Sequence, residues 1–266
     1  MFNDDSLPIP PLQMRELVGP TDPIDFRNLD GENVFPDLPS SAYENVVDFG
    51  SGCGRLARRM LLQRDQPTQY LGIEIHKGMV QWCQKNLTPA AKNFKFVSHN
   101  AYNVNLNPKG LAHPKALPID SPSGTASLVI AWSVFTHLLE SQVYDYLSEM
   151  RRILRDGGSL LSTWFLFDKT DYPMMQNFQN TLYINYSDPT NATIFDLQWL
   201  LDTATKAGLV ATRVIPPAIR GFQWVIEFSP SDGRQHVLFP KDEALIGHQP
   251  PPAPTAPVHL IGLDGD

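Results

Sequence analysis

The sequence is poor in cysteine, in charged side chains and in long apolar runs. Its 266 residues include two cysteines, Cys53 and Cys83, too few for a disulfide framework or a cysteine-based zinc cluster. No apolar run approaches the roughly 18 residues that a membrane-spanning helix requires. The N-terminal residues also lack the basic and apolar regions of a secretion signal. We therefore expect a reduced, cytoplasmic protein.

Positive charge is also scarce. Lysine and arginine together number 21 against 28 aspartates and glutamates, which gives a formal net charge of -7. Nucleic-acid binding by counterion release needs a basic surface, and anionic membranes attract basic segments. The charge balance therefore disfavours nucleic-acid and membrane partners and leaves small molecules and proteins. It does not determine the oligomeric state.

Proline is abundant, with 24 residues gathered largely toward the two ends of the chain. We expect residues 1–42, which contain a short helical pattern at 12–18, to form an N-terminal strap or cap. Residues 43–230 are expected to be the main domain, with a lid insertion at about 166–192, because long polar loops in compact domains are usually functional. Residues 231–266 are interpreted as an extension that ends in a proline-rich mobile tail.

Within the main domain, strand-length apolar runs alternate with helical patterns, which is typical of an α/β fold with a doubly wound parallel sheet. Strands are expected at 46–49, 70–74, 93–98, 126–132 and 159–165, and two more at 209–215 and 223–228. Helices are expected at 55–62, 79–87 and 140–154. A further helix, capped by Thr193 or Asp196, is expected to end near Lys206.

The most specific motif is a glycine-rich turn between the first strand and the first helix. Its sequence is Asp-Phe-Gly-Ser-Gly-Cys-Gly over residues 48–54. A ligand that crosses the end of a parallel strand needs close approach to the backbone, which side chains at Gly50 and Gly52 would obstruct. An acid at Asp48 suits a ligand that carries an ammonium group. The turn lacks both the G-x-G-x-x-G spacing of dinucleotide folds and the Gly-Lys-Ser/Thr ending of a P-loop.

A second acid, Glu74, ends the second predicted strand. An acid at this position can bind both ribose hydroxyls of a nucleoside, as it does in dehydrogenases. The alternatives are that Asp48 caps the turn and Glu74 is solvated at a helix start, or that the chain is a nicotinamide oxidoreductase. The glycine spacing argues against the oxidoreductase.

Residues 47–54 together with Gly-Ile-Glu-Ile at 72–75 resemble the first two motifs of class I S-adenosylmethionine-dependent methyltransferases. The resemblance continues at 98–101, at 131–138 and at the turn 152–158. It implies a Rossmann-like, seven-stranded, mostly parallel sheet with one antiparallel strand near the C-terminus, and methyl transfer from S-adenosyl-L-methionine. At 98–101 Asn100 stands where many members carry an acid beside the adenine. The resemblance implies a cofactor-binding set of Asp48, Phe49, Gly50, Ser51, Gly52, Gly54, Glu74, Ile75, Asn100, Ala101, Trp132 and Ser133.

Methyl transfer to a hydroxyl needs a base to take the proton. His137 is our candidate, because it follows the fourth strand at the expected start of a helix, on the edge where ligands bind in open α/β sheets. The alternatives are that His137 caps that helix or packs against the cofactor, that His99 is the base, or that no base is used.

The predicted substrate-binding residues are aromatic or basic and lie near the same edge or in the lid; they are Tyr102, Tyr183, Arg220 and Trp224. The segment after strand four lacks the Pro-Pro box of amino-methylating nucleic-acid enzymes, and no clustered acids suggest a metal. The sequence thus predicts O-methylation of a small molecule or glycan. The alternatives are N-methylation of a small-molecule amine or peptide, and a non-catalytic nucleoside-binding module.

Overall fold

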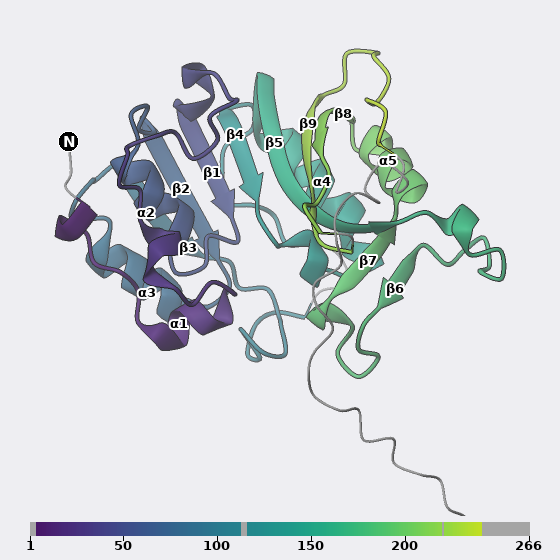
Figure 1. Ribbon diagram of the computed structural model, residues 1–266, viewed down its shortest axis with the longest axis horizontal. Helices are drawn as coiled ribbons and strands as arrows, with labels where there is room; N and C mark the ends of the chain where they lie inside the picture. Colours follow the sequence, from purple (N-terminus) through teal and green to yellow (C-terminus); the bar gives the residue numbers. More distant parts are fainter. Residues whose placement is uncertain (1–3, 113–115, 220, 241–266) are drawn as a thin grey trace, which may run out of the picture.

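A sheet with helices on both faces forms the centre of the molecule (Figure 1). The computed structural model describes residues 4–112, 116–219 and 221–240. Seven strands follow one another across the main sheet in the order β3-β2-β1-β4-β5-β9-β8, with β9 antiparallel to both of its neighbours. They are β1 Asn45–Phe49, β2 Gln69–Glu74, β3 Phe94–Ser98, β4 Ala126–Ala131, β5 Leu154–Phe167, β8 Leu209–Ile215 and β9 Trp224–Pro230. The predicted doubly wound, seven-stranded fold with an antiparallel strand near the C-terminus is confirmed.

The two faces of the sheet carry separate cores. Helices α2 (Arg55–Leu62) and α3 (Lys77–Asn86) cover one face, and α4 (Glu140–Ile153) and α5 (Leu197–Lys206) cover the other. Successive side chains of β4 alternate between them, so that Ile130 packs with the first pair and Val129 with the second. All six residues of β4 are buried, as expected for a central parallel strand.

The predicted lid region forms a small extension of the sheet. Residues 165–167 at the end of β5 pair with β7 (Thr193–Asp196), and β7 pairs with β6 (Thr181–Tyr183). The region also contains two 3-10 turns, η5 (Lys169–Asp171) and η6 (Pro189–Asn191). Of the two predicted helix caps, Asp196 accepts the Trp199 N–H at 3.0 Å, whereas Thr193 lies in β7.

The expectation that His137 begins a helix is wrong. His137 ends a 3-10 turn, η4 (Phe135–His137), and α4 begins at Glu140. The chain between them is extended, and the Leu139 N–H donates to the Gln142 side chain at 3.0 Å, which starts the helix later. His137 therefore lies on a tight turn at the edge of the sheet.

The part of the N-terminal segment around residues 12–17 lies beyond the carboxyl ends of the strands, and the chain then returns to the amino end of β1 (Figure 1). The predicted helix at 12–18 is α1 (Leu12–Leu17), and three 3-10 turns accompany it: η1 (Asp4–Ser6), η2 (Pro23–Phe26) and η3 (Ser40–Tyr43). The predicted mobile tail lies largely outside the described residues. In the part of the chain that the structure describes, no helix has the length and apolarity to cross a membrane.

Candidate active site

A cavity of about 790 Å³ lies at the carboxyl ends of β1, β2 and β4. The glycine turn, the end of β2 and Ala101 form one end of it, and the N-terminal segment closes this end. The segment after β4, residues 102–104, residues 187–190 and Gln223 form the other end. Of the predicted residues, those that line the cavity are Asp48, Phe49, Gly50, Ser51, Gly52, Glu74, Ile75, His99, Ala101, Tyr102, Trp132, Ser133 and His137.

The glycine turn folds tightly against its neighbours. Gly50 and Gly52 have φ angles of 86° and 54°, in the left-handed region that favours glycine. A Cβ atom at Gly50 would lie 2.3 Å from Cγ2 of Val134, and one at Gly52 would lie 2.8 Å from Cγ1 of Val18. The turn therefore has room for backbone alone, as the sequence predicts, and its bare surface faces the cavity.

Asp48 is a buried carboxyl with one unused oxygen. Its side chain is 1% exposed, and Oδ2 accepts the Tyr70 hydroxyl proton at 2.5 Å. Oδ1 has no hydrogen-bond partner among the described residues. Burial raises the pKa of Asp48 to about 7, although the Tyr70 hydrogen bond opposes the shift. A buried polar atom without a partner is costly, so Oδ1 needs a donor or a cation from a ligand.

Glu74 is also buried, and backbone groups fix its orientation. Oε2 accepts the Gly52 N–H at 2.9 Å, and Oε1 accepts the His76 N–H at 2.8 Å. Burial raises the pKa of Glu74, and the two N–H donors counteract it. Each carboxylate oxygen retains acceptor capacity toward the cavity. The alternative of a solvated Glu74 is wrong, because the side chain is 6% exposed.

Sequence reasoning missed Arg55, which lines the same end of the cavity. Its guanidinium makes no hydrogen bond or ion pair with another described residue. Burial lowers its pKa, and the neighbouring Arg59 adds to this, while Asp48 opposes it. A signal was present: Arg55 begins α2, where the helix dipole disfavours a cation. The cofactor end thus offers two buried acids and one cation.

His137 lies at the opposite end, and its tautomer follows from its partner. Its Nδ1 lies 2.9 Å from the carbonyl oxygen of Thr190. A carbonyl only accepts, so Nδ1 carries a proton, and in the neutral imidazole Nε2 is an acceptor. Thr190 belongs to η6, and Asp188 beside it accepts the Asn105 side-chain amide at 2.9 Å. The insertion therefore holds His137 and forms the cavity wall at this end.

His99, the second candidate base, is buried beside the cofactor end. Its Nε2 lies 3.0 Å from the Tyr146 hydroxyl, and its ring packs edge-on against Phe49. Burial lowers the pKa of His99, which keeps the imidazole neutral.

Ser133 has a strained backbone at the junction of the two ends. Its φ is 56°, the one positive value among the described non-glycine residues. Its N–H donates to Thr163 Oγ1 at 2.7 Å, and its hydroxyl donates to Gln223 at 3.0 Å. Strain of this kind often accompanies a functional site.

Several predicted residues do not line the cavity. Gly54 caps α2 and faces Leu87 and Cys83. Asn100 is exposed and accepts the Asn107 amide.

Two of the predicted substrate-binding residues also lie elsewhere. Tyr183 belongs to β6, the edge strand of the insertion, and lies against Tyr186. Trp224 is buried in β9 against Phe239. Arg220 lies outside the described residues. Among the described residues, no group of three or more histidines, cysteines or acids is arranged to hold a metal ion.

Residues 46–158 match the model of a family described as a methyltransferase domain. The match covers less than half of the chain, and the matched part is similar to the class I S-adenosylmethionine-dependent methyltransferases that the motifs resemble. The methyltransferase family uses S-adenosyl-L-methionine as its cofactor. The residues of the cavity fit this cofactor, because the orphaned Asp48 oxygen and the bare glycine turn lie in the matched region.

Solved structures with a similar fold include several methyltransferases. One is the O-methyltransferase NcsB1 from neocarzinostatin biosynthesis, with 14% identity over 73% of this chain and 51% of that chain and a TM-score of 0.48. A TehB-like enzyme from Corynebacterium glutamicum has 13% identity over 74% and 90% of the two chains and a TM-score of 0.46. The glycopeptide N-methyltransferase MtfA has 12% identity over 71% and 82% and a TM-score of 0.47. The chain spans about half the length of the first of these.

Proposed function

We propose that this methyltransferase transfers a methyl group to a hydroxyl of a small molecule or glycan, with His137 as the general base. The observation that carries the proposal is that one cavity contains a buried acidic end and, opposite it, a histidine whose Nε2 is free to accept a proton. When bound, S-adenosylmethionine supplies an electrophilic methyl group on a sulfonium.

The cofactor end has a complementary group for each charge of the methionine moiety. We assign Asp48 Oδ1 to the ammonium group and Arg55 to the carboxylate, because these are the unpaired buried acid and the unpaired cation of this end. Glu74, held by two backbone N–H groups, is assigned to the ribose hydroxyls. Ala101 and Ile75 are assigned to the walls around the adenine ring of the cofactor.

At the acceptor end, His137 would take the hydroxyl proton on Nε2 while its Nδ1–H remains on the Thr190 carbonyl. The hydroxyl oxygen forms the new bond to carbon as the carbon–sulfur bond breaks, and the electron pair stays on sulfur. The walls exclude water and hold the acceptor in line with the methyl group.

The acceptor is proposed to be uncharged. The described lining of this end includes Asp188 and His137 but no lysine or arginine. Tyr102 and Gln223 offer an aromatic face and an amide, which suit a hydroxylated ring or a sugar. Tyr102 is therefore retained as a substrate contact.

The domain division is proposed as residues 1–42 for the strap and 43–230 for the catalytic domain with its insertion at 166–192. The anchoring of the strap described below supports its treatment as a separate unit.

The proposal is tested by mass spectrometry of a panel of acceptors incubated with the enzyme and S-adenosylmethionine. The panel contains matched alcohol and amine analogues of the same ring or sugar. We expect a gain of one methylene unit on the alcohols, with Asp48→Asn as the inactive control. Methylation of the amines alone would establish N-methylation instead. Cofactor binding without any transfer would support a nucleoside-binding module.

A further inference from the structure

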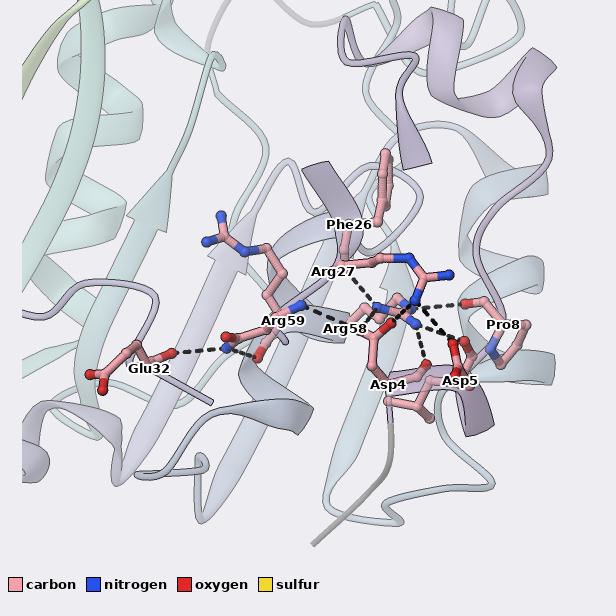
Figure 2. Close-up of polar contacts among 10 residues, drawn as sticks. Asp4, Asp5, Pro8, Phe26, Arg27, Glu32, Arg58 and Arg59 are labelled. Atoms are coloured by element: carbon pink, nitrogen blue, oxygen red, sulfur yellow. Dashed lines mark hydrogen bonds and ion pairs between the residues drawn. The ribbon is translucent and has the colours of Figure 1, made fainter. Parts of the chain in front are cut away.

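Arg58 is a fully buried arginine on α2, the helix that follows the glycine turn (Figure 2). Its side chain is 1% exposed. Nη1 donates to Asp4 Oδ1 at 2.8 Å and to the Phe26 carbonyl at 2.7 Å. Nη2 donates to the carbonyls of Asp4 and Leu7 at 2.6 and 2.9 Å, and Nε donates to that of Pro8 at 3.3 Å. These five bonds use the donor capacity of the guanidinium, and all of them go to the N-terminal segment.

The acceptors lie at both ends of one loop. Asp4, Leu7 and Pro8 form its start, and Phe26 forms its end. Arg27 reinforces the junction, because its guanidinium donates to Asp4 Oδ2 at 2.5 Å. One buried side chain of the catalytic domain thus closes the loop that residues 4–26 form, which we call the strap loop. A buried guanidinium without these partners would be strongly destabilising.

Asp4 is ionised in this arrangement. Burial raises the pKa of its carboxyl, but the Arg58 hydrogen bond, the Asn28 N–H and the nearby arginine charges outweigh burial and lower the pKa overall. The pair is therefore charged at neutral pH.

The middle of the strap loop forms the wall of the cofactor end. Residues 16–19 line the cavity, and Val18 lies against Gly52 so closely that a Cβ there would meet Cγ1 at 2.8 Å. In contrast to the two ends of the loop, α1 has no buried residue, and Leu12 and Leu17 are 46% and 50% exposed. Met14 and Val18 are partly buried against a cluster that includes Phe26, whose carbonyl Arg58 binds. The position of α1 therefore depends on the anchored ends of the loop.

We propose that Arg58 and Asp4 are positioning residues for cofactor binding, which hold the strap loop so that Val18 closes the cofactor end over the glycine turn. The proposal rests on the proposed function, which assigns this end to S-adenosylmethionine. Neither residue lines the cavity or lies near His137. Loss of the anchor therefore reduces the fraction of molecules with a closed wall and weakens cofactor binding, while turnover at saturating cofactor is retained.

The test is isothermal titration calorimetry of the full chain with S-adenosylhomocysteine. Arg58→Lys keeps the charge but loses the five-donor fork, and Asp4→Asn removes the charge. If the wall is closed in about one variant molecule in ten, the Kd of each variant for S-adenosylhomocysteine rises about tenfold. In steady-state kinetics the KM for S-adenosylmethionine rises by the same factor, and kcat is unchanged.

Asp65→Asn is the matched control. Asp65 also anchors the N-terminal region, through Asn33 and Ser40 at 2.8 Å each, but these residues lie outside the strap loop and the cavity lining. The Kd of Asp65→Asn for S-adenosylhomocysteine should equal that of the wild type. An equal loss of affinity in this control would indicate general loosening and overturn the proposal.

Hydrogen exchange of residues 12–18 provides a second measurement. Without ligand, exchange in α1 should be faster in Arg58→Lys than in the wild type, and S-adenosylhomocysteine should protect the wild type more. If the wild type binds no S-adenosylhomocysteine, the proposed function fails, and the exchange rates without ligand still test the anchor. If the wild type binds S-adenosylhomocysteine and both Arg58→Lys and Asp4→Asn bind it as tightly, the positioning role is wrong. Should Arg58→Lys not fold, Val18→Gly removes the wall alone and must raise the Kd.

Discussion

The two ends of the cavity are built by different means. At the cofactor end, Asp48 and Glu74 end adjacent parallel strands, are buried, and are held by a buried hydroxyl and backbone N–H groups. At the acceptor end, His137 is exposed and depends on a carbonyl from an insertion 53 residues away. The sheet therefore fixes the binding chemistry, whereas the loops fix the base and the walls. Rigid strand ends suit a ligand that stays the same, such as a cofactor, and loops suit a ligand that differs between proteins, such as an acceptor.

The largest effect is expected for Asp48→Asn. The substitution keeps the size and the Tyr70 contact but removes the charge that we assign to the ammonium group, so the Kd for S-adenosylhomocysteine should rise about a hundredfold. Asp188→Asn at the acceptor end serves as the control and should bind normally in calorimetry. Equal affinity of Asp48→Asn and the wild type would remove Asp48 from the cofactor site.

His137→Ala should lower kcat on an alcohol acceptor about a hundredfold, because the proton of the hydroxyl then lacks its base. The Kd for S-adenosylhomocysteine should not change, since His137 lies at the other end of the cavity. An unchanged rate would exclude His137 as the base.

The raised pKa of Asp48, about 7, makes cofactor binding pH-dependent. The ammonium group needs the ionised carboxylate, so affinity should fall about tenfold per pH unit below pH 7, with proton release on binding. Calorimetry in two buffers of different ionisation enthalpy measures that release. In Asp48→Asn both effects should be absent.

The same shift affects the ligand-free protein in the opposite direction. Because the folded pKa lies above the unfolded value, the protonated carboxyl stabilises the fold at low pH, and this contribution is lost as the pH rises from about 4 to about 7. Compared with Asp48→Asn, the free energy of unfolding of the wild type should fall by about 4 kcal/mol over that range. Urea titrations at pH 4 and 8 measure the difference, and the same change in unfolding free energy with pH in both proteins would contradict it.

The smallest effect is expected for Asn105→Ala, which removes the hydrogen bond to Asp188. Both groups are exposed, so the bond contributes about 0.5–1 kcal/mol. The KM for the acceptor should rise about threefold, with kcat and cofactor affinity unchanged. A large loss of cofactor affinity would show that the two ends are coupled rather than separate.

Local sequence predicted most of the cofactor end. Gly50 and Gly52 are constrained by backbone conformation, and Asp48 and Glu74 by their place at strand ends, all of which a short pattern reveals. Local sequence failed for Tyr183, for Trp224 and for His137 as the start of a helix. The edge position of β6, the packing of β9 and the 3-10 turn at His137 depend on contacts across the chain.

The sequence by itself determined the α/β alternation, the bare turn and the two acids, because hydrophobic period and glycine placement act over a few residues. Only the tertiary structure decided which loops form the walls, which tautomer His137 adopts, and that Arg58 holds a segment 32 to 54 residues distant. Those features arise from close packing between distant parts of the chain, where burial makes each charge and each hydrogen bond depend on its partner.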